Sequence, residues 1–245
     1  MTVPGMAEYV DRLVHWLKAQ GAGAGAAGAV VGISGGVDSA VVAALLKRAF
    51  PATTLGIIMP CDSLPRDIED ARLVAQALEV PFKEVGLGHA FRAVLGAMGK
   101  EEGPGRRLAE ANLKPRLRML VLYYHANLRN YLVAGTGNRS ELKVGYFTKH
   151  GDGGVDLLPL ARMVKSQVKE AARLLGVPCK VIEKPPTAGL WPGQTDEAEM
   201  GVTYEVLDNY ILAGEAPEDA RGIIESMARR SAHKLSPPVM PDFEP

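Results

Sequence analysis

Residues 29–39 read Ala29-Val30-Val31-Gly32-Ile33-Ser34-Gly35-Gly36-Val37-Asp38-Ser39, and this stretch decides the fold. The run from Ala29 to Ile33 is apolar without alternation, which is typical of a strand buried on both faces of a parallel sheet. A polar turn, Ser34–Asp38, follows, and a helix is expected from Ser39 to Ala49. This order places the turn at the carboxyl end of a strand, where open α/β sheets bind their ligands.

The same alternation of strand and helix continues along the chain. Strands that alternate with helices form βαβ units and a mostly parallel sheet. We therefore predict an α/β fold with a doubly wound, mostly parallel sheet, helices on both faces and a single domain over residues 1–245. The further strands are expected at 54–59, 81–85 and 131–135, and the further helices at 66–78, 108–129, 165–175, 204–212 and 218–230.

Composition excludes several classes of protein. The chain has 245 residues, with 28 Lys and Arg against 28 Asp and Glu, and this zero net charge argues against a nucleic-acid binder. Its two cysteines cannot form a four-cysteine zinc site. The N-terminus does not resemble a signal peptide, and no apolar run approaches the ~18–20 residues that span a bilayer. A reduced, cytoplasmic protein that does not bind membranes is expected.

A second glycine-rich segment, Gly23-Ala-Gly25-Ala-Ala-Gly28, fits the G-x-G-x-x-G pattern of dinucleotide-binding proteins. That pattern binds a pyrophosphate only where it follows a strand and opens a helix. Here it precedes the strand. We interpret the stretch from Gly21 to Gly28 as a flexible linker.

The turn after the first strand is the candidate phosphate site. Glycines tolerate unusual φ angles, so Ser34, Gly35 and Gly36 can direct backbone N–H groups at an anion. No Gly-Lys-Ser/Thr follows, so the turn is not a Walker A loop. An aspartate beside phosphates requires a cation, and Mg²⁺ would join the Asp38 carboxylate to phosphate oxygens. The alternative is that Asp38 is only a helix N-cap.

This turn resembles the pyrophosphate-binding loop of the ATP pyrophosphatases, a superfamily with a Rossmann-like fold. Further segments resemble NAD synthetases, among them Asn112-Leu-Lys-Pro-Arg116-Leu-Arg118-Met119 and Thr148-Lys149-His150-Gly151-Asp152-Gly-Gly. The resemblance runs from about Val30 to Lys234. It continues through Val133–Glu141, Lys165–Val168, Pro185–Leu190, Gln194–Glu197 and Gly201–Tyr204, and ends at His233-Lys234.

The resemblance implies a ligase that amidates the nicotinate carboxylate of deamido-NAD to NAD. ATP adenylates the carboxylate with release of pyrophosphate, and ammonia then displaces AMP. Family positions imply Asp38 and Lys165 as catalytic residues, and Asp38 and Glu141 as ligands of Mg²⁺. The implied ATP contacts are Gly32, Ile33, Ser34, Gly35, Gly36, Val37, Asp38, Ser39, Thr136, Lys165 and Thr187. The implied deamido-NAD contacts are Arg116, Lys149, Asp156, His233 and Lys234.

Several interpretations stay open. By spacing alone, Arg116 and Arg118 belong to a solvated helix face, and Glu141 is a surface acid. A different adenylating amidase of the GMP synthetase type, or a nucleotide-binding module without chemistry, would share the loop. Only about 30 residues precede the first strand, so free ammonia is the expected donor unless a separate subunit delivers it. The resemblance also implies a homodimer, with the helix at 108–129 as an interface element. The segments 98–105 and 183–197 are expected to be loops, and the second could be a lid.

Overall fold

The computed structural model describes residues 5–99, 102–189, 191 and 193–243. At its centre is a parallel four-stranded sheet in the order β3-β2-β1-β4. The strands are β1 (Gly28–Gly32), β2 (Thr54–Ile58), β3 (Phe82–Glu84) and β4 (Tyr131–Ala134). The chain moves outward from β1 in one direction to β2 and β3, and then returns to the other side of β1 for β4. This reversal confirms the predicted doubly wound topology and puts a ligand crevice between the ends of β1 and β4.

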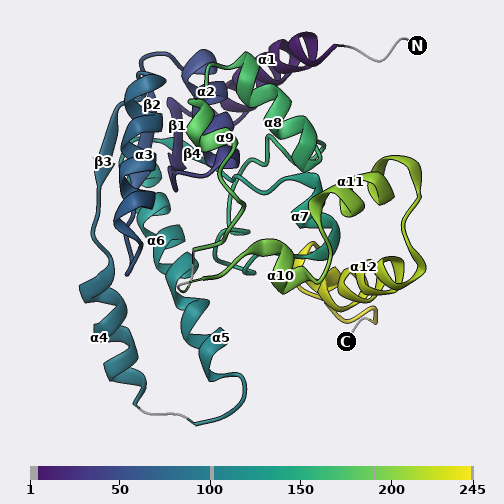
Figure 1. The fold of residues 1–245 in the computed structure, drawn as a ribbon. Helices are drawn as coiled ribbons and strands as arrows, with labels where there is room; N and C mark the ends of the chain where they lie inside the picture. The colour runs from purple at the N-terminus through teal and green to yellow at the C-terminus, as the bar shows by residue number, and fades with distance from the viewer. Residues whose placement is uncertain (1–4, 100–101, 190, 192, 244–245) are drawn as a thin grey trace.

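Helices cover both faces of the sheet, as predicted (Figure 1). Val31 of β1 packs into a cluster with one set of helices, and Val30 packs into a second cluster on the opposite face. Successive strand residues point to opposite faces, which explains the unbroken apolar run in β1. The first set is α1 (Met6–Gly23), α2 (Val37–Ala49), α3 (Pro65–Ala77) and α8 (Lys165–Leu174), and the second is α4 (Gly88–Met98) and α6 (Leu113–Asn127).

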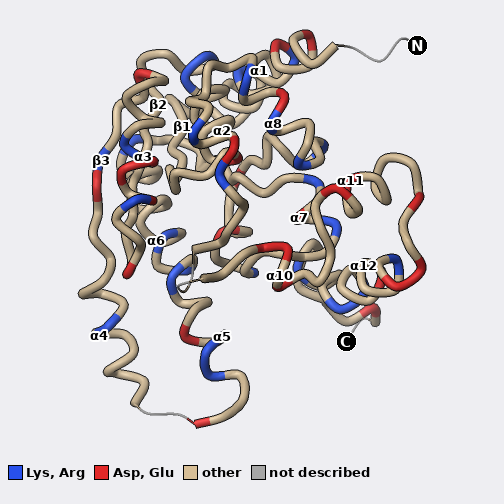
Figure 2. The backbone as a smooth tube through the Cα atoms, viewed as in Figure 1, with Lys and Arg blue, Asp and Glu red and all other residues tan. Residues whose placement is uncertain are grey.

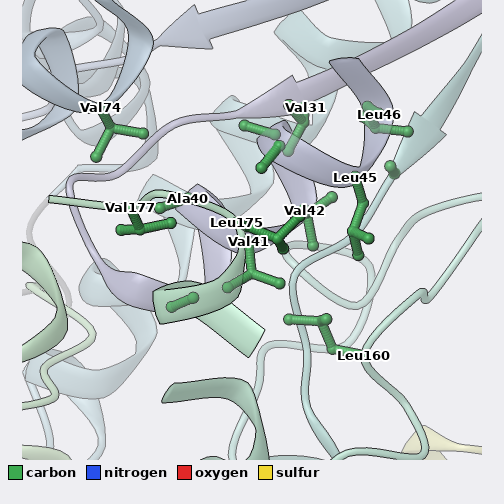
Figure 3. Close-up of a cluster of buried hydrophobic side chains, with 14 of the residues drawn as sticks. Val31, Ala40, Val41, Val42, Leu45, Leu46, Val74, Leu160, Leu175 and Val177 are labelled. Carbon is green, nitrogen blue, oxygen red and sulfur yellow. The ribbon is translucent and has the colours of Figure 1, made fainter. Parts of the chain in front are cut away.

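Helix α2 is the most deeply buried helix of the first set. Val41, Val42, Leu45 and Leu46 are fully buried, because α2 lies between the sheet and the helices α1 and α8 (Figure 3). A helix that is apolar around most of its circumference requires cover on several sides. The rigid packing of α2 fixes the position of the turn at its N-terminus.

A third apolar cluster lies beside the sheet layers and joins α7 (Arg139–Val144), α11 (Tyr204–Ala213) and α12 (Glu218–Ser231). It contains Val144, Met200, Val202, Tyr204, Leu207 and Ile224. Buried hydrogen bonds connect it to the sheet layers, since Asp208 accepts from the Ser140 hydroxyl at 2.6 Å and from the Ser166 backbone N–H at 2.8 Å. The remaining short helices are α5 (Arg106–Ala111), α9 (Cys179–Ile182), α10 (Asp196–Met200) and the 3₁₀ turn Ala232–Lys234.

The structure corrects two predictions and adds helices that the sequence did not predict. Helix α1 continues through Gly23, so part of the predicted linker is helical, and Gly21 is buried against the ring of Phe50. The predicted helix 108–129 is two helices that meet at Asn112, because Pro115 has no N–H to donate and its ring would crowd the carbonyl of a preceding helical turn. Helices α4, α7, α9 and α10 were not predicted. Residues 100–101 of the predicted 98–105 loop lie outside the described residues.

Basic and acidic positions are interspersed along the backbone in Figure 2, without a large region of one sign in that view. Cys61 is buried, Cys179 is exposed, and both are free. No helix in the described part of the chain is long and apolar enough to cross a membrane.

Candidate active site

The turn between β1 and α2 forms one wall of a cleft of about 590 Å³. Hydrogen bonds within this segment stabilise the turn. The Ser39 hydroxyl donates to the Gly36 carbonyl at 2.9 Å and accepts from the Ser34 backbone N–H at 3.2 Å. Of residues 32–39, all but Gly35 line the cleft. Gly35 has φ +78° and faces α3, where a Cβ would lie 2.6 Å from the Asp67 carbonyl oxygen. Glycine is therefore required at this position by both backbone angle and space.

Asp38 is not a helix cap. Gly36 is the N-cap of α2, and this cap has no side-chain hydrogen bond. The Asp38 carboxylate instead accepts hydrogen bonds from Lys165 Nζ at 2.5 Å and from the Asn138 side-chain amide at 2.8 Å. Three segments far apart in sequence thus meet at Asp38.

Glu141 reaches the same point through a capping box at the start of α7. Asn138 accepts from the Glu141 backbone N–H at 3.0 Å, and the Glu141 carboxylate accepts from the Asn138 backbone N–H at 3.1 Å. Its other carboxylate oxygen lies 3.6 Å from Lys165 Nζ. The interpretation of Glu141 as a surface acid is therefore wrong, because α7 begins directly beside the phosphate turn.

Carboxylates outnumber cations at this centre. Burial and the neighbouring Asp38 raise the pKa of Glu141 to about 8. Burial would lower the pKa of Lys165, but the carboxylates of Asp38 and Glu141 more than reverse this and raise it. Asp196 also lies here, 4% exposed, and burial raises its pKa as well. A single lysine among three acids leaves room for an additional cation.

The donor set fits Mg²⁺. Asp38, Glu141 and Asp196 offer hard oxygen ligands, and Asp196 Oδ1 is buried without a hydrogen-bond partner. No group of three His, Cys, Asp or Glu side chains stands close enough to hold an ion by itself, in the part of the chain that the structure describes. An ion here would complete its shell with phosphate oxygens and water, as Mg²⁺ prefers.

Basic side chains also line the cleft. Arg116, Lys149, His233 and Lys234 all line it. Arg116 donates to the Lys149 carbonyl at 3.4 Å, and Lys149 Nζ donates to the His233 carbonyl at 2.6 Å. Lys234 Nζ donates to the carbonyls of Gly145 and Phe147 at 2.7 and 2.8 Å. The C-terminal end of the chain is thereby held against the loop that follows α7.

The remaining predicted site residues differ in whether they line the cleft. Thr136 and Thr187 line the cleft, and the Thr187 hydroxyl donates to the Gln194 carbonyl at 2.8 Å. Asp156 does not line it. The Asp156 carboxylate accepts from the Tyr123 hydroxyl at 2.9 Å and from the Val133 backbone N–H at 2.7 Å. These two hydrogen bonds attach the segment that contains Asp156 to α6 and β4.

Several charged residues of the cleft had no role predicted from the sequence, among them Arg118, Lys184 and Asp196. Lys184 Nζ lies 2.8 Å from Asp67 and 2.7 Å from Asp70, and 3.5 Å from the Gly35 carbonyl. Arg118 is half-buried, against the expectation of a solvated face, whereas Arg116 is exposed. Only contacts between distant segments distinguish these residues, so spacing could not have found them.

The predicted lid is represented by residues 183–189, 191 and 193–197, because 190 and 192 lie outside the described residues. Trp191 lines the cleft, and the Arg107 guanidinium of α5 stacks 4.5 Å from the centre of its ring. This segment therefore lies against α5 at Trp191.

Comparison with known proteins gives a consistent result. The family model of NAD synthase matches residues 9–238. The chain is 52% identical to the NH(3)-dependent NAD(+) synthetase of Carboxydothermus hydrogenoformans over 96% of this chain and 97% of that protein. Among solved structures, NMN synthetase from Francisella tularensis has a TM-score of 0.94 at 37% identity, covering 98% of this chain and 100% of that chain. NAD+ synthetase from Burkholderia pseudomallei has a TM-score of 0.79 at 27% identity, covering 95% and 91%.

Proposed function

This chain belongs to the NAD synthase family, and from that membership we infer that it is a ligase that converts deamido-NAD to NAD with ammonia and ATP. The reaction has two halves. The nicotinate carboxylate attacks the α-phosphorus of ATP, a mixed anhydride forms, and pyrophosphate leaves. Ammonia then attacks the acyl carbon, AMP leaves, and the nitrogen loses a proton to give the amide.

One observation carries this assignment: Asp38, Glu141 and Lys165 converge beside the phosphate turn, in the same cleft as the basic side chains of Arg116 and Lys149. A binding module without chemistry would need the turn but not this pair of acids. A carboxylate is a poor electrophile, so the enzyme must bring two polyanions together and stabilise the charge that moves to pyrophosphate.

We propose that residues 32–39 bind the triphosphate through backbone N–H groups at the start of α2. Lys165, a compact point charge, would contact the phosphates from the opposite side. Mg²⁺, held by Asp38 and Glu141, would neutralise phosphate charge and so favour departure of pyrophosphate. Thr136 and Thr187 complete the proposed ATP contacts.

We propose that Arg116, Lys149, His233 and Lys234 bind the phosphates and riboses of the acceptor. Asp156 remains a proposed acceptor contact, although it lies outside the cleft lining and would have to be reached by a ligand that extends past it. This division places ATP at the ends of β1 and β4 and the acceptor against α6.

Amidation measured with purified protein tests the assignment. We expect NAD to form from deamido-NAD, ATP, Mg²⁺ and ammonium, and expect xanthosine monophosphate not to be amidated. With ¹⁸O in the acceptor carboxylate, AMP should acquire label, since one carboxylate oxygen leaves with the phosphorus. AMP without label would reject the adenylate. Replacement of ammonium by glutamine tests whether this chain needs a separate source of ammonia.

A second acceptor is the mononucleotide acid whose amide is NMN. The TM-score of 0.94 to an NMN synthetase favours it, as does the position of Asp156 outside the cleft lining. A mononucleotide lacks the adenylate half of deamido-NAD and would need fewer contacts beyond the cleft. The ratio of kcat/KM for the two acids decides between them.

We further propose a cytoplasmic homodimer in which residues 1–245 act as one domain. Leu120, Tyr124 and Leu128 form an exposed apolar stripe on α6, with exposed fractions of 60%, 62% and 62%. Their spacing of four residues places them on one helix face, and such a stripe is typical of an interface.

A further inference from the structure

Arg118 is a charged residue of the cleft to which the proposed reaction gives no role. It lies on the face of α6 that also presents Pro115, Met119 and Leu122 to the cleft, away from the exposed apolar stripe. Its Nε donates to the Met59 carbonyl at 3.2 Å, directly after β2. This contact holds the guanidinium at the carboxyl edge of the sheet.

The position lies between the two proposed binding regions. A Cβ on Gly32, the last residue of β1, would stand 3.0 Å from the Met59 side chain and 3.8 Å from Leu122. Met59, whose carbonyl accepts from Arg118, therefore also lies against the end of the strand that leads into the turn. On the other side, the cleft wall continues from α6 to Asp152, which accepts from the Thr148 backbone N–H at 2.9 Å.

The charge of Arg118 is not neutralised by contact. Among the residues that the structure describes, no carboxylate lies within ion-pair distance of its guanidinium, and the Met59 carbonyl is its hydrogen-bond acceptor. Burial lowers the pKa of this guanidinium, and Asp152 attracts it only at longer range. A guanidinium has five N–H donors, and the Met59 carbonyl accepts from only one nitrogen, so the other donors are open to a ligand in the cleft.

We propose that Arg118 binds an anionic group at the point where the two substrates react. This group is either the carboxylate of the acceptor or the α-phosphate of ATP. The planar fork of a guanidinium matches either anion with two parallel hydrogen bonds. Held by Met59, Arg118 orients that anion for attack at the α-phosphorus. The inference rests on the proposed function, since it assumes that both substrates occupy this cleft.

Calorimetric titration of Arg118→Gln separates the two sources. The ligands are deamido-NAD and NAD, which differ in the carboxylate, and AMP and adenosine, which differ in the phosphate. Loss of a charge-assisted hydrogen bond should weaken the binding of either deamido-NAD or AMP by roughly 10- to 100-fold. The affinity for the other member of that pair, NAD or adenosine, should stay unchanged. Arg118→Lys, which keeps the charge but not the fork, should recover part of the loss.

Arg92→Gln is the matched control, because Arg92 is exposed, pairs with Asp62 at 3.4 Å and does not line the cleft. It should leave all four affinities unchanged. The proposal would be overturned if a folded Arg118→Gln or Arg118→Lys protein bound all four ligands as the wild type does. It would also be overturned if the affinities for deamido-NAD and NAD fell equally. If the wild type itself failed to bind deamido-NAD, the proposed function would fail, and the pair of AMP and adenosine would still decide whether Arg118 binds an anion.

Discussion

Replacement of Gly35 by alanine tests the claim that the phosphate turn depends on close contact with α3. At φ +78° an added Cβ would stand 2.6 Å from the Asp67 carbonyl oxygen and 2.9 Å from the Ala71 nitrogen, both backbone atoms that cannot rotate away. The left-handed backbone costs an L-residue about 1–2 kcal/mol. Overpacking adds about 1–3 kcal/mol, so the conflict amounts to about 2–5 kcal/mol.

Gly25 provides a matched control. It has φ +62°, but nothing lies within 4 Å of the position that its Cβ would occupy. Gly25→Ala should therefore lose only the backbone part, about 1–2 kcal/mol, and bind ATP normally. In Gly35→Ala the extra strain should appear as further destabilisation, or as displacement of the turn from α3 with weaker ATP binding.

Urea denaturation and calorimetric titration with ATP measure the two effects separately. The free energy of unfolding reports the strain that remains in the folded protein, and the Kd for ATP reports strain relieved by movement of the turn. If Gly35→Ala matched Gly25→Ala in both measurements, the close approach to α3 would have no energetic consequence and the reasoning would be wrong.

Three further substitutions test the acid centre, the acid stability and the proposed dimer. Asp38→Asn should lower kcat by roughly 100-fold or more with little change in the melting temperature, because the charge at the phosphates is lost while the shape is kept; normal turnover would reject the Mg²⁺ role. Burial would raise the pKa of Asp70, but hydrogen bonds from Lys180 and Lys184 lower it overall, so its contribution to stability is present above the unfolded pKa of about 3.9 and is lost as pH falls through the lowered folded value. Asp70→Asn should accordingly flatten the acid side of the melting-temperature profile, and a profile as steep as that of the wild type would contradict this. Leu120→Glu should convert the proposed dimer to a folded monomer in light scattering, and a dimer of unchanged mass would exclude the α6 stripe as the interface.

Local sequence was sufficient for the strands and for the position of the turn between β1 and α2. The apolar run of β1 predicts a strand covered on both faces, and Val30 and Val31 do pack into clusters on opposite faces. Glycine at position 35 is informative by itself, because few other residues adopt its backbone angle. The helix 108–129 was wrong in one respect: apolar periodicity continues through Asn112, whereas the hydrogen-bond ladder is broken by Pro115.

For the candidate site too, local sequence accounts for some features and contacts between distant segments account for the others. The sequence by itself determined which residue types are present and where the phosphate turn lies, since strand, turn and helix are adjacent in the chain and obey local rules. Only the tertiary structure decided that Asp38 meets Lys165 and Asn138 rather than capping its own helix, that Arg118 faces the cleft and that Asp156 lies outside its lining. Burial, charge pairing and the direction of a side chain are set by contacts between segments that lie up to 149 positions apart, and periodicity along the chain contains no information about those contacts.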